Sequence, residues 1–506
     1  SYWNGIDVWG NADMSQYPTS NQGAVSILNG GIISHAEHAI QVAKILNEEV
    51  LYRYTGGIVR CDSAFFLNNM QDVSFYQYTN VEPSTQADIP NRSYFYDTEF
   101  INDELCTKQV YVNLNRVDGI RFQGCAFSNN TSQDDCISDC YKGNGLISHN
   151  AGFYIEDYCL DQNPTSPYPC QDSLPCSFTN LDHGIYVLNS GGNEIIDIDN
   201  ADFINNKSGI FMSLVSQQSI TRNRFIIDEE NDLAGYSDEI VIGVNIEYGN
   251  YYTVEENVFT NTSDLSETAG MQALNSEQYY NEIYNNSFSG FKAGITAAGN
   301  NRDKYGTGLC IKCNDFTDCS NDIYVTDEGG SGYLGIAYKQ GEIAPEPPQG
   351  QDPDPTYAAG NTFTEMSGDY TNYTNLENCH QIEYTYHGNV GNPEIKVKPE
   401  PIYPDPSIEH IKPIPDQSVT YNSKSEACPS NIGTGINLTS ASSMLASESA
   451  LVDAYLDTLN IYIDGGDTEG LNQEVQLTLP DEPLQIKPQL MSHSPYLSDT
   501  VMISSI

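Results

Sequence analysis

The chain has 506 residues, with 21 Lys and Arg against 69 Asp and Glu, and its formal net charge is −48. This charge argues against binding of nucleic acid, whose phosphates need a basic surface, and against adsorption to anionic membranes. The sequence has no apolar run long enough for a membrane-spanning helix, so we expect no membrane insertion. The acidity suits either a solvated, self-repelling surface or oxygen ligands for calcium.

The chain has thirteen cysteines, which favours an oxidising, extracellular compartment and therefore a secreted protein. An odd number leaves at least one thiol free or paired outside the segment. Cys136 with Cys140, and Cys159 with Cys170 or Cys176, are candidate staples of loops. Cys310, Cys313 and Cys319 are candidates for disulfides or buried structural thiols, since no second Cys-x-x-Cys or His pair suggests zinc.

The chain begins with two segments that read as short strands ending in Gly/Asn turns, Trp3–Asn11 and Gly23–Ile33. A repeat of Phe flanked by Asn follows, which includes the motif at Phe66 and then runs on from Phe127. The steps from Phe127 onward are 26, 25, 25, 22, 34, 29, 28 and 47 residues. The Phe positions in this series are Phe127, Phe153, Phe178, Phe203, Phe225, Phe259, Phe288, Phe316 and Phe363.

A second marker, Gly followed by an aliphatic residue, keeps step with the Phe repeat at Gly184, Gly209, Gly243, Gly270 and Gly294. Between the markers the apolar residues alternate with polar ones, which indicates strands rather than helices. Periods in the twenties with three short strands per coil predict an all-β, right-handed parallel β-helix over residues 1–395. About twelve coils at about 4.8 Å each would make a rod of roughly 50–65 Å.

Asn and Gly at the corners of the coils are expected to adopt the left-handed bend, and Asn to bond its counterpart in the next coil. Pro-rich insertions at 161–176 and 341–358 predict loops pushed outward from the coils. The tyrosine clusters Tyr251-Tyr252, Tyr279-Tyr280 and Tyr370/Tyr373 form either outward aromatic ladders or stacks along the solenoid.

The repeat stops near residue 395. Residues 396–440 are rich in Pro and predict an extended linker. Residues 441–506 predict a helical tail that leads to further downstream domains, with helical spacing over 441–463 and short helical pieces at about 469–477 and 486–506.

Several stretches in order resemble a family of large, secreted right-handed β-helix surface proteins exported by the type IX secretion system of gliding bacteria. This resemblance implies export, display at or release from the cell surface, and a very large parent protein. It implies no catalytic residue. The stretches are Trp3–Asn11, Gly119–Phe127, Gly143–Phe153, Gly308–Phe316, Ile382–Tyr386, Ile463–Thr468 and Ser494–Asp499.

Enzymatic motifs are weak in this sequence. Asp134-Asp135 has a superficial likeness to the paired carboxylates of glycan hydrolases, but the expected basic and histidine motifs do not follow it. Calcium is the one cofactor that the composition suggests, with weak candidate ligands at Asp228, Glu229, Glu230 and Asp232.

We therefore expect a non-catalytic structural or adhesive segment of a large secreted cell-surface protein or appendage, assembled as a homo-oligomer or larger surface assembly. The alternative is a β-helix that binds or cleaves glycans, with a surface glycan as its partner.

Overall fold

The computed structural model describes residues 2–47, 49–104, 110–131, 142–160, 172–190, 194–228, 240–276, 279–345, 354–365, 371–392, 394–400, 410–432, 468–478, 490, 497–498 and 501. It divides into two compact units, Ser1–Ile432 and Gly433–Ile506.

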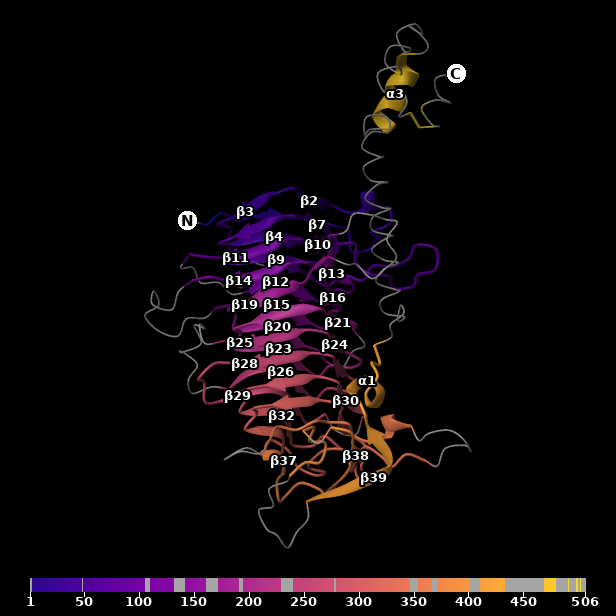
Figure 1. The fold of residues 1–506 in the computed structure, drawn as a ribbon. Helices are drawn as coiled ribbons and strands as arrows, with labels where there is room; N and C mark the ends of the chain where they lie inside the picture. Colours follow the sequence, from indigo (N-terminus) through magenta and orange to yellow (C-terminus); the bar gives the residue numbers. More distant parts are fainter. Residues whose placement is uncertain are drawn as a thin grey trace. The chain divides into compact units, whose positions relative to one another are not determined.

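The first unit is a right-handed parallel β-helix, as predicted. Three parallel sheets surround one core, and each coil gives one strand to sheet 2, then one to sheet 3, then one to sheet 1 (Figure 1). Sheet 1 has twelve strands and sheets 2 and 3 have ten each, in agreement with the expected number of coils.

Sheet 1 consists of β1 (Ile6–Asp7), β4 (His38–Val42), β9 (Gln71–Phe75), β12 (Val110–Asn115), β15 (Asn144–His149), β20 (His183–Leu188), β23 (Ser208–Ser213), β26 (Val241–Glu247), β29 (Thr268–Leu274), β32 (Ala293–Ala298), β35 (Asn321–Thr326) and β37 (Thr371–Asn375). Sheet 2 consists of β2 (Ala24–Leu28), β7 (Ile58–Asp62), β10 (Tyr94–Tyr96), β13 (Ile120–Gln123), β16 (Phe153–Glu156), β21 (Ile196–Asp199), β24 (Ser219–Thr221), β27 (Thr253–Glu255), β30 (Asn281–Tyr284) and β33 (Leu309–Lys312). Sheet 3 consists of β3 (Ile32–Ser34), β8 (Phe65–Leu67), β11 (Glu99–Asn102), β14 (Ala126–Asn129), β19 (Cys176–Thr179), β22 (Ala201–Ile204), β25 (Arg224–Ile227), β28 (Val258–Asn261), β31 (Ser287–Ser289) and β34 (Asp315–Thr317).

The chain also contains smaller elements outside the three long sheets. Two antiparallel hairpins project from the coils, β5 (Lys44–Leu46) with β6 (Glu49–Leu51) and β17 (Tyr158–Cys159) with β18 (Ser173–Leu174). Of the predicted loop 161–176, residues 161–171 lie outside the described residues, and its end was wrong, since Ser173–Leu174 form β18 and Cys176 begins β19. The other elements are η1 (Thr19–Asn21), η2 (Tyr52–Tyr54), η5 (Pro355–Tyr357), β36 (Lys339–Gln340), β38 (Ile382–Val390), β39 (Ile411–Tyr421), α1 (Lys424–Ala427) and α3 (Thr468–Thr478).

A column of stacked phenylalanine rings on the inner side of sheet 3 forms the centre of the core. Neighbouring rings have centroids 4.6 to 6.1 Å apart and nearly parallel planes. Offset stacking of this kind adds stability to the burial of the rings. The column consists of Phe66, Phe100, Phe127, Phe178, Phe203, Phe225, Phe259, Phe288, Phe316 and Phe363.

One member of the predicted Phe series was wrong. Phe153 lies in β16 of sheet 2, where it pairs with Ile120 and Ile196, and not in the column. The coil from Phe127 to Phe178 has 51 residues, of which 132–141 and 161–171 lie outside the described residues. Phe153, in a sheet-2 strand in the middle of this long coil, therefore happens to lie at the spacing expected for successive members of the column.

The predicted glycine marker faces the phenylalanine column. A Cβ atom on Gly243 would lie 2.5 Å from the carbonyl oxygen of Gly270 and 2.8 Å from Cδ1 of Phe259. Gly184, Gly209, Gly270 and Gly294 have equivalent contacts. Glycine is required at these positions because the neighbouring Phe ring occupies the space that a side chain would need.

Asparagine has both expected roles at the corners, the left-handed bend and the hydrogen bond to the next coil. Two adjacent residues share these roles. Between sheets 2 and 3, Asn285 takes the left-handed conformation with φ of 57°. The next residue, Asn286, is fully buried, donates from Nδ2 to Oδ1 of Asn314 at 3.0 Å and accepts from Nδ2 of Asn257 at 2.9 Å. The same ladder joins Asn223 to Asn257 and Asn314 to Asn361.

The last coils are closed by a small sheet of β36, β38 and β39. Tyr384 of β38 packs against Phe363, with ring centroids 5.8 Å apart, and so covers the end of the phenylalanine column. The predicted linker 396–440 was wrong for residues 411–421, which form β39. Because β39 is an edge strand, Pro413 and Pro415 are tolerated despite their missing N–H groups.

The described part of the second unit contains α3, which confirms the short helix expected at about 469–477. Leu471 and Val475 of α3 are buried together with Val501. The rest of the predicted helical tail 441–506 lies mostly outside the described residues. No described helix has the length and apolar character needed to cross a bilayer.

Candidate functional site

Some of the candidate cysteines form disulfides and others do not. Cys313 is bonded to Cys428, with Cα atoms 5.6 Å apart, which joins the β33–β34 corner to the segment after β39. Cys159 is also disulfide-bonded. Cys136, Cys140 and Cys170 lie outside the described residues.

Cys176 is a free thiol, so its pairing with Cys159 was wrong. Cys310 and Cys319 are also free, and of the two alternatives left open for them, disulfide or buried structural thiol, Cys319 is the buried thiol. The Sγ atom of Cys176 accepts a hydrogen bond from the backbone N–H of Cys125 at 3.2 Å. Cys319 is fully buried, and burial raises the pKa of its thiol to about 12, which makes it unreactive.

The structure offers little support for the calcium candidates. The carboxylate of Asp228 accepts a hydrogen bond from Nδ2 of Asn205 at 3.0 Å, so it belongs to a corner contact between coils. Glu229, Glu230 and Asp232 lie outside the described residues. Across the described ranges, no group of three or more His, Cys, Asp or Glu side chains could hold a metal ion.

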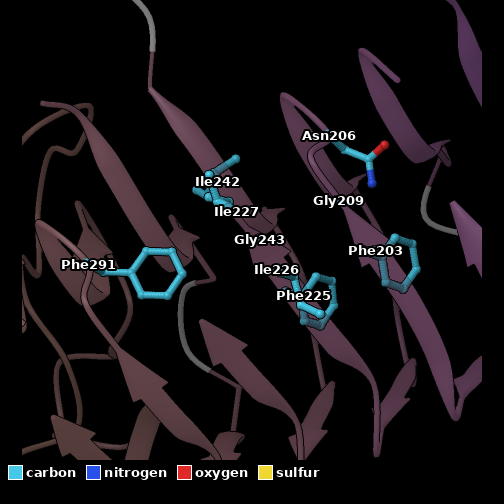
Figure 2. A pocket seen from close by; sticks show the side chains of 9 residues that line it. All are labelled: Phe203, Asn206, Gly209, Phe225, Ile226, Ile227, Ile242, Gly243 and Phe291. Atoms are coloured by element: carbon cyan, nitrogen blue, oxygen red, sulfur yellow. The ribbon is translucent and has the colours of Figure 1, made fainter. Parts of the chain in front are cut away.

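A hollow between coils is visible in Figure 2, beside Phe203 and Phe225 and the backbone at Gly209 and Gly243. Its lining is mostly apolar, and it has room for about one water molecule. It is therefore a packing defect next to the phenylalanine column and too small for a sugar. The paired carboxylates Asp134 and Asp135 lie outside the described residues.

The outer face of sheet 2 carries a cluster of ionisable groups on β13, β16 and β21. Nη1 of Arg121 donates to Oε2 of Glu156 at 3.0 Å, and Nε2 of Gln123 donates to the same oxygen at 3.0 Å. The guanidinium also lies 4.5 Å from the ring centre of Tyr154. Only 6% of the Arg121 side chain and 13% of the Glu156 side chain are exposed, so this pair is largely shielded from water.

The next coil adds two more carboxylates to this cluster. Asp197 pairs with Tyr154 across the sheet, and Asp199 accepts hydrogen bonds from the guanidinium of Arg222. Burial, followed by the charges of Asp199 and Glu156, raises the pKa of Asp197 to about 7. A carboxyl whose pKa is raised beside two carboxylates that are held by cations is a pattern also found in acid–base sites.

Exposed tyrosines gather at the corner between sheets 1 and 2, on consecutive coils. Tyr248, Tyr251 and Tyr280 are 44%, 52% and 49% exposed, respectively. The rings of Tyr251 and Tyr279 have centroids 4.9 Å apart, and the hydroxyl of Tyr280 donates to Glu282 at 3.0 Å. We call Tyr248, Tyr251, Tyr279 and Tyr280 the tyrosine edge.

The two alternatives left open by the sequence, outward ladder and buried stack, both occur within the Tyr251-Tyr252 cluster. Tyr251 and Tyr280 face outward, whereas Tyr252 and Tyr373 are fully buried. Tyr370 lies outside the described residues.

Sequence reasoning missed the sheet-2 cluster altogether. Its members come from separate coils, and only the register brings Arg121 beside Tyr154 and Tyr154 beside Asp197. The signal that could have found it is the alternation Ile196-Asp-Ile-Asp, which turns two successive carboxylates outward.

The chain matches no protein-family model and no curated protein. Among solved structures it is similar to tailspike protein 3 of bacteriophage CBA120, with 12% identity and a TM-score of 0.25 over 82% of this chain and 52% of that chain. It is also similar to a mutant tailspike protein of E. coli bacteriophage HK620 in complex with a hexasaccharide, with 12% identity and a TM-score of 0.27. That match covers 74% of this chain and 66% of the tailspike. The present chain thus spans about half the length of the first tailspike.

Proposed function

We propose that the chain is a non-catalytic structural and adhesive segment of a large secreted cell-surface protein or appendage. The observation that carries this proposal is the continuity of the side-chain columns. Phenylalanine rings run through ten successive coils and the asparagine ladder through five, and glycines with no room for a side chain face the rings from Phe203 to Phe316. Such columns suit a stiff rod that spaces or displays other parts.

The outer surface supports the same proposal. The charged side chains of the sheet-2 cluster are engaged with one another, as Arg121 with Glu156 and Arg222 with Asp199. A catalytic site needs groups that remain available to substrate in a concave setting. Export by a type IX system, which the resemblance suggests, belongs to this proposal as the route to the cell surface.

The test is to label intact cells of the source organism with antibodies against this chain and to compare their adhesion with that of cells that lack the segment. We expect surface labelling and loss of adhesion. In parallel, the purified chain is incubated with neutral and acidic polysaccharides, and new reducing ends or unsaturated ends are measured. We expect none.

Depolymerisation that is lost in Asp197→Asn and Glu156→Gln, but retained in the matched exposed variant Glu342→Gln, would contradict the non-catalytic proposal. Normal adhesion by cells without the segment would contradict the adhesive part. The two results are independent of each other.

A second candidate function, glycan binding, is favoured by the tyrosine edge. Exposed aromatic rings beside a carboxylate can stack on sugar faces and accept hydrogen bonds from hydroxyl groups. Binding to a glycan array that falls at least tenfold in Tyr251→Ala or Tyr280→Ala would support it. The control is Tyr52→Ala, which removes a ring with 56% exposure near the other end of the coil stack. Equal loss in the control would assign the signal to non-specific contact.

A further inference from the structure

The outer face of sheet 1 is almost free of charge. Side chains at the outward positions of β4 to β37 are mainly Asn, Gln, Ser, Thr, Ala, His and aliphatic or aromatic residues, with no Lys or Arg, and Glu247 is the one carboxylate among them. The edge strand β1 adds Asp7. In a chain with 69 acidic residues, a face of eleven strands with one carboxylate calls for an explanation.

The other sheets do not share this property. The outward positions of sheet 2 carry charges on seven of ten strands, and four of the ten strands of sheet 3 carry one, including the ion pair of Arg224 with Asp202. The charged outward residues of sheet 2 are Arg60, Asp62, Arg121, Glu156, Asp197, Asp199, Glu255, Glu282 and Lys312. The lack of charge on sheet 1 is therefore specific to that face and not a requirement of the fold.

The middle of the sheet-1 face is apolar. Tyr186 and Phe211 are paired across neighbouring strands and their rings stack at 4.9 Å, and Ile147 precedes them in the same column. His183 packs edge-on against Tyr186 at 5.0 Å. All four side chains are partly exposed, so their contact with a partner would remove further apolar surface from water.

The size of the face suits a stable contact. Eleven strands at about 4.8 Å and a width of five residues at about 3.3 Å give roughly 800–900 Å², close to the ~800 Å² per partner of a typical specific interface. In Figure 1 the strands of sheet 1 from β4 to β32 lie side by side, and no described element crosses them.

We propose that the outer face of sheet 1 is the contact surface for a second copy of this chain. The argument is electrostatic. A basic partner would be attracted by the acidic faces and would gain nothing from sheet 1, whereas a second copy with the same charge of −48 can approach closely only where neither copy presents carboxylates. This inference rests on sheet 1 and not on the adhesive role proposed above.

A two-fold contact of this kind makes a specific prediction. In an isologous pair, residues near the centre of the face meet their own counterparts. β23 is the seventh of the twelve strands in sheet 1, so Phe211 lies near that centre. A charge placed at Phe211 would therefore face the same charge in the partner.

The experiment is sedimentation velocity of the full chain over a range of concentrations. We expect a dimer for the unmodified chain and at least a tenfold weaker dimer for Phe211→Glu. An equimolar mixture of Phe211→Glu and Phe211→Lys is expected to restore a heterodimer. Raising the salt concentration should strengthen the dimer of the unmodified chain, since it screens the repulsion between the acidic surfaces.

The matched control is Val258→Glu, which adds the same charge at an outward position of β28 in sheet 3, where the side chain is 45% exposed. It is expected to dimerise like the unmodified chain, and circular dichroism melting checks that all variants are folded. A monomer at every concentration and salt would overturn the proposal. So would a dimer that Val258→Glu weakens as much as Phe211→Glu does, or that Phe211→Glu leaves intact.

Discussion

Sheets 1 and 2 share one core and present opposite outer surfaces. Their inward residues are the same kind of Ile, Val and Leu, such as Ile210 in sheet 1 and Ile220 in sheet 2. Outside, sheet 1 is nearly uncharged, whereas sheet 2 carries ion pairs and carboxylates. In this fold the backbone ladder and the inward columns specify the structure, so each outer face can acquire a different chemistry. Four predictions test that separation.

The largest effect on stability is expected from a residue of the shared core, because the core supports the outer faces of both sheets. Phe259→Ala removes one ring from the middle of the stacked column and leaves a cavity beside Gly243. We expect the free energy of unfolding to fall by about 3–5 kcal/mol in urea denaturation. Val258→Ala, one residue earlier and exposed, is the control and should change it by less than about 1 kcal/mol. Similar losses for both variants would show that the column is not the main source of stability.

The next effect is confined to sheet 2. Arg121→Met leaves the carboxylate of Glu156 without its charged donor in a shielded position. We expect a loss of about 2–3 kcal/mol, because an unpaired buried charge costs more than the pair contributes. The double variant Arg121→Met with Glu156→Gln should recover part of the loss. If the double variant is no more stable than the single one, the pair does not act as a unit.

The third effect depends on pH. The pKa of Asp197 is raised to about 7 by burial, so its contribution to stability is fully present below the ordinary pKa of 3.8 and is lost as the pH rises through about 7. Asp197→Asn should therefore be more stable than the unmodified chain at pH 8, by roughly 2 kcal/mol, and no more stable at pH 4. Thermal melts at the two pH values measure this. A constant difference between pH 4 and pH 8 would mean that Asp197 titrates normally.

The smallest effect on stability is expected on sheet 1. Tyr186→Thr changes an outward residue of β20 that lies in no ion pair, so the unfolding free energy of the monomer should stay within about 0.5 kcal/mol. Its effect should instead be seen in self-association. Denaturation at dilute concentration separates the two readouts, and a large loss of monomer stability would show that sheet 1 and sheet 2 are not independent.

The coil repeat could be predicted from the sequence because the columns demand fixed residue types. Phe at one inward position and Gly at the facing one recur whatever the loops between them do. The same reasoning failed at Phe153, since a period alone does not tell which sheet a residue joins.

Longer-range features could not be predicted for physical reasons. Cys313 and Cys428 are 115 residues apart and meet only because β39 returns to the last coils. The Pro-rich segment was mistaken for a linker because Pro is rare in strands, except at an edge such as that of β39. The chemistry of the outer faces depends on register across coils, which the sequence pattern leaves undetermined until the loop lengths are known.

The bond between Cys313 and Cys428 has a mechanical consequence. If the chain is pulled from a point beyond Cys428, the tension reaches Cys313 through the covalent bond and bypasses β36, β38 and β39. The small closing sheet is therefore shielded from the load, as is β34, and the first strand to bear it is β33, inside the coil stack. Yielding would then proceed coil by coil from that corner, with extension released in steps of one coil, while the cap keeps its contacts with Phe363.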